Sequence, residues 1–140
     1  MSHHVFVSSR ISTARHRALN LRIGAACEAL GLRPFLPQVE LDDEVLTAID
    51  ILHGNERAVA SASLVIVVFD AAAAGVAMEL AQARALDKPI LGYRTGRSEA
   101  RERLGMMLQG AWEALPDARR VRTLRELDVA LARLRDDLTR

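Results

Sequence analysis

The sequence predicts an α/β protein with a doubly wound, five-stranded parallel sheet, and three observations lead to this fold class. Residues 63–70 are almost continuously apolar and β-branched, which is typical of a strand buried on both faces. A loop of small residues at 71–75 follows, and an alanine-rich helix is expected over residues 77–86. Strand-like and helix-like segments alternate along the chain with short connections, as in a parallel sheet covered by helices.

The other strands are indicated by short apolar runs between turn-forming residues. They are expected at residues 4–9, 33–38, 89–94 and 119–122. Pro34 and Pro37 place the second strand at an edge, because proline lacks the N–H group that a central strand needs. The expected strand order is 2-1-3-4-5, as in flavodoxin-like folds, with the switch point between the first and third strands.

Helices are predicted where apolar residues recur at helical spacing behind a capping residue. The first runs from a cap at Ser12 or Thr13 to about residue 30, where Gly31 ends it. The second opens with the acidic residues 42–44, is interrupted at Gly54 and resumes through residue 62. Two more are expected after residue 86, at 98–115 and, behind a capping-box sequence, at 123–138.

Composition limits the classes of partner and the compartment. The 140 residues are expected to form one domain over residues 1–140, and the net charge of +1 gives no concentrated basic face for duplex nucleic acid. No apolar run is long enough for a membrane span, and the N-terminus lacks the apolar core of a signal peptide. With Cys27 as the single cysteine, these features predict a cytoplasmic protein. The four histidines lack metal-ligand spacing, so neither a metal nor a cofactor is expected.

Polar residues gather where the first and third strands are expected to end. Ser8, Ser9 and Arg10 follow the first strand, and the loop at 70–75 follows the third. The carboxyl ends of parallel strands meet at one edge of a sheet, where helix N-termini bind anions. Glu79 stands in the first turns of the helix after the third strand. Hydroxyls, a guanidinium and a helix N-terminus around one carboxylate suit a polar ligand with a phosphate or a sugar.

Each of these residues also has a purely structural interpretation. An acid such as Glu79 in the first turns stabilises the helix dipole, and Asp70 can form a turn at the end of its strand. The two serines can satisfy loop backbone groups, and Arg10 can be a solvated surface residue. Arg94 and Arg97, after the fourth strand, are expected to lie beside the same edge of the sheet.

Five short segments form a recognisable set, at residues 5–9, 35–37, 64–67, 75–83 and 88–90. They resemble the nucleoside 2-deoxyribosyltransferase family, which includes 2′-deoxynucleoside 5′-phosphate N-hydrolases and cytidylate N-glycosidases. The most specific segment, Gly-Val-Ala-Met-Glu-Leu-Ala-Gln-Ala at 75–83, is similar to the family's G-V-G-Y-E-L-G-R-A. Residues 104–110, Leu-Gly-Met-Met-Leu-Gln-Gly, are similar to L-S-A-M-I-x-G of the phosphate-hydrolase branch. The resemblance implies the fold derived above.

The resemblance also implies an enzyme that cleaves or exchanges the base of a nucleoside or a nucleoside 5′-monophosphate. Glu79 would be the nucleophile that attacks the anomeric carbon and forms a glycosyl ester, and Asn55 would lie near the sugar as the second catalytic position. The expected substrate-binding residues are Ser8, Ser9, Arg10, Asp70, Ala73, Gly75, Gly105 and Met107.

The sequence departs from the family's pattern at three polar positions. Asn55 replaces an acid, Ala73 replaces an acid or a serine, and Gly105 replaces a serine that is lent across a dimer. Asn55 can form hydrogen bonds but cannot protonate a leaving base. The alternative is therefore a catalytically weakened nucleotide-binding or assembly module of the same fold. An unrelated receiver-like domain is disfavoured, because residues 8–10 are not an acidic cluster.

A homodimer is expected on the helix at residues 98–115. Leu104, Met107, Leu108 and Trp112 recur at three- and four-residue spacing and predict one apolar stripe. A helix packed only on its own sheet also needs such a stripe, but Met106 makes the apolar surface wider. In the family that the chain resembles, this segment completes the site of the neighbouring subunit.

Overall fold

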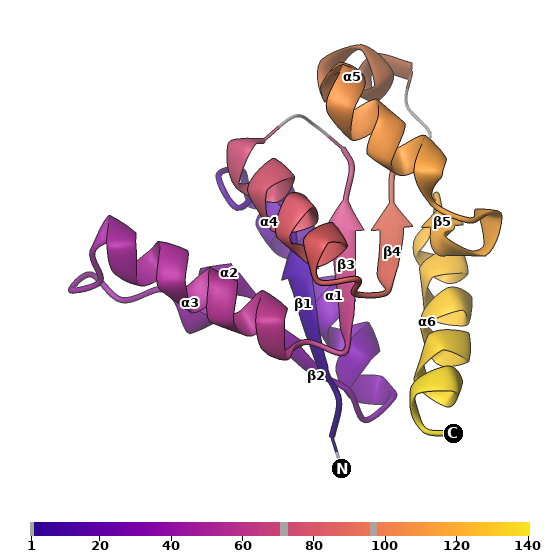
Figure 1. The fold of residues 1–140 in the computed structure, drawn as a ribbon, viewed down its shortest axis with the longest axis horizontal. Coiled ribbons are helices and arrows are strands. Elements are labelled where there is room, and N and C mark those ends of the chain that lie inside the picture. The colour runs from indigo at the N-terminus through magenta and orange to yellow at the C-terminus, as the bar shows by residue number, and fades with distance from the viewer. Residues whose placement is uncertain (1, 71–72, 96–97) are drawn as a thin grey trace.

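The computed structural model of the chain describes residues 2–70, 73–95 and 98–140. Its sheet is parallel throughout and has the order β2-β1-β3-β4-β5, which confirms the predicted fold class and strand order. The strands are β1 (His4–Ser8), β2 (Arg33–Phe35), β3 (Leu64–Val68), β4 (Ile90–Tyr93) and β5 (Arg120–Val121). Both ends of the chain lie at the end of the sheet opposite the carboxyl ends of the strands (Figure 1).

Helices cover both faces of the sheet. They are α1 (Ala14–Ala29), α2 (Pro37–Glu40), α3 (Ala48–Ser61), α4 (Ala74–Ala85), α5 (Ser98–Ala114) and α6 (Leu124–Leu138), with a 3-10 turn η1 (Asp117–Arg119). α1 and α6 pack on one face, and α3, α4 and α5 pack on the other (Figure 1). In the described part of the chain, no helix is both long and apolar enough to cross a membrane.

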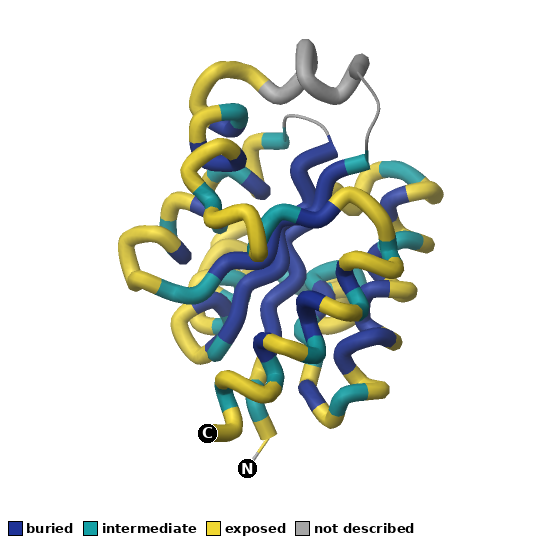
Figure 2. Tube along the Cα trace, turned by 90° about the vertical axis from the view of Figure 1, so that its right-hand side faces the viewer, coloured by how far each residue is buried: buried dark blue, intermediate teal, exposed yellow. Residues whose placement is uncertain are grey.

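The core is two-sided because successive side chains of a strand point to opposite faces. Leu64, Ile66 and Val68 of β3 belong to the cluster under α1 and α6. Val65 and Val67 belong to the cluster under α3, α4 and α5. All five residues of β3 are buried, as the apolar run predicts, and the strands form the dark interior of Figure 2.

The region after β2 differs from the expected strand and helix bounds. Residues 37–40 form α2 instead of extending the edge strand, because Pro37 supplies a helical φ at a first-turn position where no N–H is needed. α3 begins at Ala48 and not at residues 42–44, since Thr47 and Asp50 form the capping box there.

Gly54 does not interrupt α3, contrary to the sequence-based expectation. A Cβ atom at this position would lie 2.9 Å from Cδ2 of Leu41. The glycine therefore lets the segment before α3 pack closely against the helix. Gly54 marks this close contact with Leu41, and it does not mark the end of a helix.

α5 is broken at Gly105, whose φ of 75° and ψ of 160° are not helical. The expected continuous stripe is wrong for this reason. Leu108 and Trp112 are buried against the sheet, whereas Met106 and Met107 are 90% and 89% exposed. Met107 is thus not on the face that Leu108 and Trp112 share, and a pair of exposed methionines follows the break.

Candidate active site

Glu79 is held at the carboxyl edge of the sheet by a strand residue. Ser8 is the last residue of β1 and is completely buried, and its hydroxyl donates a 2.7 Å hydrogen bond to Oε1 of Glu79. α4 begins at Ala74 and packs against β1 and β3, which places Glu79 in its second turn. The hydrogen bond fixes the orientation of the carboxyl group relative to the end of the strand.

The surroundings of Glu79 change its acidity. Burial raises the pKa of the Glu79 carboxyl from 4.5 to about 7, and the hydrogen bond from Ser8 opposes this shift. Near neutral pH the carboxyl group is therefore divided between its neutral and ionised forms. A carboxyl group with such a raised pKa is typical of functional sites.

A cavity of about 260 Å³ lies beside Glu79, between α3 and α4. Apolar side chains including Ile51, Leu52 and Met78 line part of its wall, and Gly75 and Glu79 line it from the start of α4. A mainly apolar cavity with a few polar groups is the usual form of a small-molecule site.

Asn55 lines the same cavity from α3. Its Oδ1 atom is buried and accepts no hydrogen bond within the described residues. A buried acceptor without a partner costs free energy, and a ligand that carries a donor group would satisfy it. The structure thus brings Asn55, Gly75 and Glu79 together at one cavity.

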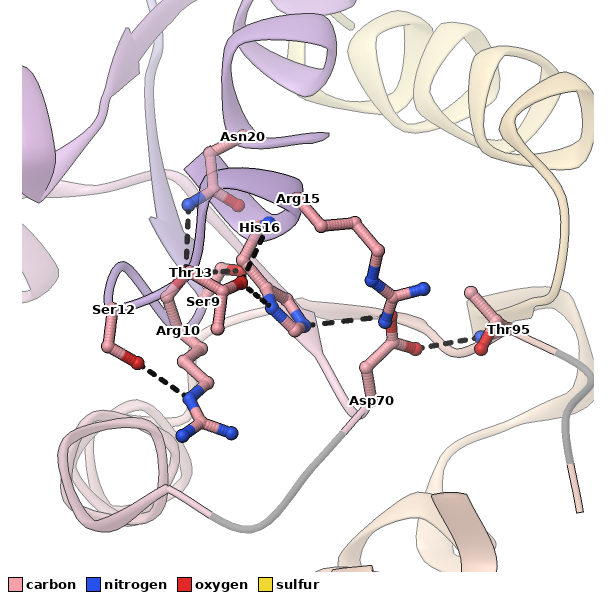
Figure 3. A network of polar contacts seen from close by, with 9 residues as sticks. All are labelled: Ser9, Arg10, Ser12, Thr13, Arg15, His16, Asn20, Asp70 and Thr95. Carbon is pink, nitrogen blue, oxygen red and sulfur yellow. Dashed lines mark hydrogen bonds and ion pairs between the residues drawn. The ribbon is translucent and has the colours of Figure 1, made fainter. Parts of the chain in front are cut away.

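Asp70 is not among the residues that line this cavity, and it lies beside Arg15 and His16 at the start of α1 (Figure 3). Its Oδ1 accepts a 2.9 Å hydrogen bond from the backbone of Thr95, and its Oδ2 lies 3.6 Å from Nη2 of Arg15. Nε2 of His16 is 3.9 Å from Oδ2, and Nδ1 of His16 is 2.6 Å from the hydroxyl of Thr13. Asp70 therefore joins the loops after β3 and β4 to the start of α1.

His16 and Arg15 were not predicted as partners of Asp70. Burial and the nearby Arg15 lower the pKa of His16, and Asp70 opposes this effect. The imidazole is therefore neutral at pH 7 and serves the packing of the loops. The signal in the sequence was the alternation of side chains, which places residue 70 on the same face as Val68 and hence toward α1.

The remaining polar residues of the β1–α1 loop lie outside the cavity beside Glu79. Ser9 is buried, and its hydroxyl lies 3.5 Å from the carbonyl oxygen of Arg10. The exposed Arg10 donates from Nε to the hydroxyl of Ser12 at 2.7 Å (Figure 3). Thr13 caps α1, which confirms one of the two expected capping residues.

A comparison with known proteins settles the family. The sequence model for nucleoside 2-deoxyribosyltransferase matches residues 6–115. The chain belongs to the nucleoside 2-deoxyribosyltransferase family. A search of curated proteins finds no match. The resemblance inferred from the short segments is therefore confirmed.

Solved structures share the fold of this nucleoside 2-deoxyribosyltransferase family member at low sequence identity. A conserved protein from Enterococcus faecalis V583 is similar with a TM-score of 0.76 and 15% identity, over 96% of this chain and 99% of that one. A 2-deoxyribosyltransferase from Bacillus psychrosaccharolyticus has a TM-score of 0.56 and 16% identity, over 82% and 93% of the two chains. A Leishmania mexicana 2-desoxiribosyltransferase has a TM-score of 0.56 and 18% identity, over 66% and 65%.

Several expected site positions do not line this cavity of the single chain, and their roles stay predictions. Ala73 is the residue before α4 and provides no side-chain cap, and Gly105 and Met107 lie at the break in α5, outside the cavity. Arg94 is buried and donates a 2.8 Å hydrogen bond to Gln109, so it lies under α5 and not at the open edge. Arg97 is outside the described residues. No group of three metal-binding side chains occurs within the described ranges.

Proposed function

We propose that this family member is an N-glycosidase that cleaves or exchanges the base of a nucleoside 5′-monophosphate, with Glu79 as the nucleophile. The observation that carries the proposal is the Glu79 carboxyl group, which Ser8 orients at the mouth of a cavity of suitable size. The family match at residues 6–115, which includes Glu79, supports an enzyme of this class.

The proposed reaction uses the ionised carboxylate of Glu79. An oxygen of Glu79 attacks the anomeric carbon while the bond from that carbon to the base breaks, and the bonding electrons leave with the base. The resulting glycosyl ester is then attacked by water, which gives hydrolysis, or by a second base, which gives transfer. Ser8 stabilises the ionised form through its hydrogen bond.

The test is to incubate the protein with nucleosides and nucleoside 5′-monophosphates, with and without an acceptor base, and to measure free base by chromatography. Release of base without an acceptor indicates a hydrolase, and formation of a new nucleoside indicates a transferase. Binding of monophosphates without turnover supports the second candidate, a nucleotide-binding module. Ala73 and Gly105 favour that candidate, because neither residue supplies the polar group found in the family.

The pH dependence of base release tests the role of Glu79. We expect kcat/KM to rise as pH increases through about 7, because the nucleophile must be ionised and its pKa is about 7. Ser8→Ala removes the hydrogen bond that lowers this pKa, so the rise should move to higher pH. An unchanged profile in Ser8→Ala would show that another group controls the rate.

A preference for monophosphates is the second prediction of the proposed function. We expect Arg10, together with the backbone at the start of α4, to bind the phosphate. A charge-assisted hydrogen bond contributes about 1.5–3 kcal/mol, or a roughly tenfold to hundredfold preference over the nucleoside. Affinities measured at low salt should show this preference in the wild type and its loss in Arg10→Ala. Arg84→Ala, at the far end of α4, is the matched control. Equal affinities in the wild type contradict the choice of substrate.

We also propose that the protein acts as a homodimer through the region around the break in α5. Met106 and Met107 are almost completely exposed there, and two neighbouring apolar side chains are costly to leave in water.

A further inference from the structure

A second carboxyl group opens onto the cavity that Glu79 lines. Glu56 lies on α3 and lines the same cavity of about 260 Å³ as Glu79 and Asn55. We propose that Glu56 is the proton donor for the departing base, taking over from the position where the family has an acid and this chain has Asn55. The proposal rests on the proposed function and supplies the second group that cleavage of an N-glycosidic bond needs.

The geometry of α3 directs Glu56 toward the cavity. The cavity-lining residues of this helix are Ala48, Ile51, Leu52, Asn55 and Glu56. They recur at three- and four-residue spacing, which places all of them on one face of the helix. Glu56 therefore belongs to the same face as Asn55. An acid at position 56 instead of position 55 still lies at the cavity.

A hydrogen bond joins the backbone of Glu56 on α3 to a side chain of α4. Nε2 of Gln82 donates to the backbone oxygen of Glu56 at 2.8 Å. Gln82 stands three residues after Glu79, on the same face of α4, and also lines the cavity. The two carboxyl groups are thus carried by helices that are tied together beside the cavity.

The carboxyl group of Glu56 makes no hydrogen bond or ion pair with the described residues. The other acid of α3, Asp50, accepts a hydrogen bond from the backbone of Thr47 as part of the capping box. Glu56 is exposed and is not required for any such contact. Among the described residues that line the cavity, Glu56 and Glu79 are the two that can exchange a proton.

Glu56 transfers one proton in each of the two steps of the proposed reaction. Glu79 attacks the anomeric carbon, the bond to the base breaks, and its electron pair is taken up as Glu56 delivers a proton to the base. In the second step the Glu56 carboxylate accepts a proton from water, and the water oxygen attacks the anomeric carbon and releases Glu79. The net reaction adds one water molecule across the N-glycosidic bond and restores both carboxyl groups.

The leaving base provides the sharpest test. The base of 2′-deoxyguanosine 5′-monophosphate needs a proton as it departs, whereas the base of the N7-methylated nucleotide is already cationic and leaves as a neutral molecule. We expect Glu56→Gln to lower kcat by about 100-fold on the first substrate and by no more than a few-fold on the second. The rate of spontaneous loss of the methylated base is measured in the presence of the Glu79→Gln variant and subtracted from each enzymatic rate. If pyrimidine nucleotides are the better substrates, 2′-deoxyuridine monophosphate and its 5-fluoro form make the corresponding pair.

Rescue separates a proton donor from a structural residue. Asn55→Asp in the Glu56→Gln background should restore at least tenfold of the lost activity on the unmethylated nucleotide, since it returns an acid to the same helix face. Glu28→Gln, an exposed acid on α1, is the matched control and should leave both rates unchanged. Equal effects of Glu56→Gln on both substrates, or no rescue, would overturn the assignment of Glu56. Absence of base release from either nucleotide by the wild type would instead overturn the proposed function.

Discussion

We expect Glu79→Gln to abolish base release, with a fall in kcat of at least about a thousandfold. The amide has nearly the same volume and can still accept the hydrogen bond from Ser8, but it cannot form the glycosyl ester. Affinity for a nucleoside 5′-monophosphate, measured by calorimetry, should stay within a few-fold of the wild type. A variant that keeps most of the wild-type rate would show that Glu79 is not the nucleophile.

The same substitution should stabilise the fold above neutral pH. The native pKa of Glu79 is raised from 4.5 to about 7, so between these two pH values the native state holds a proton that the unfolded state has already lost. The free energy of unfolding therefore falls as pH rises from about 4.5 to about 7, by up to about 3 kcal/mol. Glu79→Gln removes this cost.

Chemical denaturation at two pH values tests the linkage. At about pH 8 the Glu79→Gln variant should be more stable than the wild type, and at about pH 4 the two should be nearly equal. A gain in stability combined with a loss of activity is typical of a residue kept for function at the expense of stability. Equal stability at both pH values would mean that burial does not raise the pKa of Glu79.

The fold was predictable because its strongest signal is local. The buried run at β3 and the alternation of strands and helices define a parallel sheet without any knowledge of side-chain contacts. The bounds were less predictable because they depend on tertiary contacts. Gly54 lies within α3 because of its close approach to Leu41, and Gly105 breaks α5 although the sequence around it has helical periodicity.

The approach of Ser8 to Glu79 was predictable from the strand ends, whereas the partners of Asp70 depend on the face of the sheet and were missed. Ser8 and Glu79 meet because β1 and β3 are neighbours, which the strand order implies. Asp70 turns toward Arg15 and His16 because it lies two residues after Val68 on the same side of the sheet. Side chains alternate between the two faces of a strand, and extending this alternation past the end of β3 would have placed Asp70 on the opposite face of the sheet from Glu79.

Glu56 shows a different limit of sequence reasoning. The resemblance to the family implies an acid at position 55, so Asn55 is interpreted as a lost catalytic group. The helix face that α3 presents to the cavity includes both Asn55 and Glu56. In our proposal the acid stays on this face of α3 while its position in the sequence moves by one residue.

The second large effect concerns the exposed methionines after the break in α5. We expect Met106→Glu to give a folded monomer with at least tenfold lower activity. Met106 is 90% exposed, so the substitution costs the isolated fold little. In an apolar interface the same unpaired charge costs several kcal/mol, and about 3 kcal/mol weakens association by roughly a hundredfold.

Light scattering and activity, measured on the same samples at micromolar concentration, test the dimer. The wild type should be a dimer, and Met106→Glu should be a monomer with an unchanged circular dichroism spectrum. Val129→Glu places the same charge at a half-exposed apolar residue of α6 and should remain an active dimer.

The positive φ of Gly105 gives a second variant, because Gly105→Ala strains the break that presents Met106 and should also weaken the dimer. A monomeric wild type, or a Met106→Glu variant that remains a dimer, would exclude this surface, since an interface built on Met106 cannot bury a charge without loss of affinity.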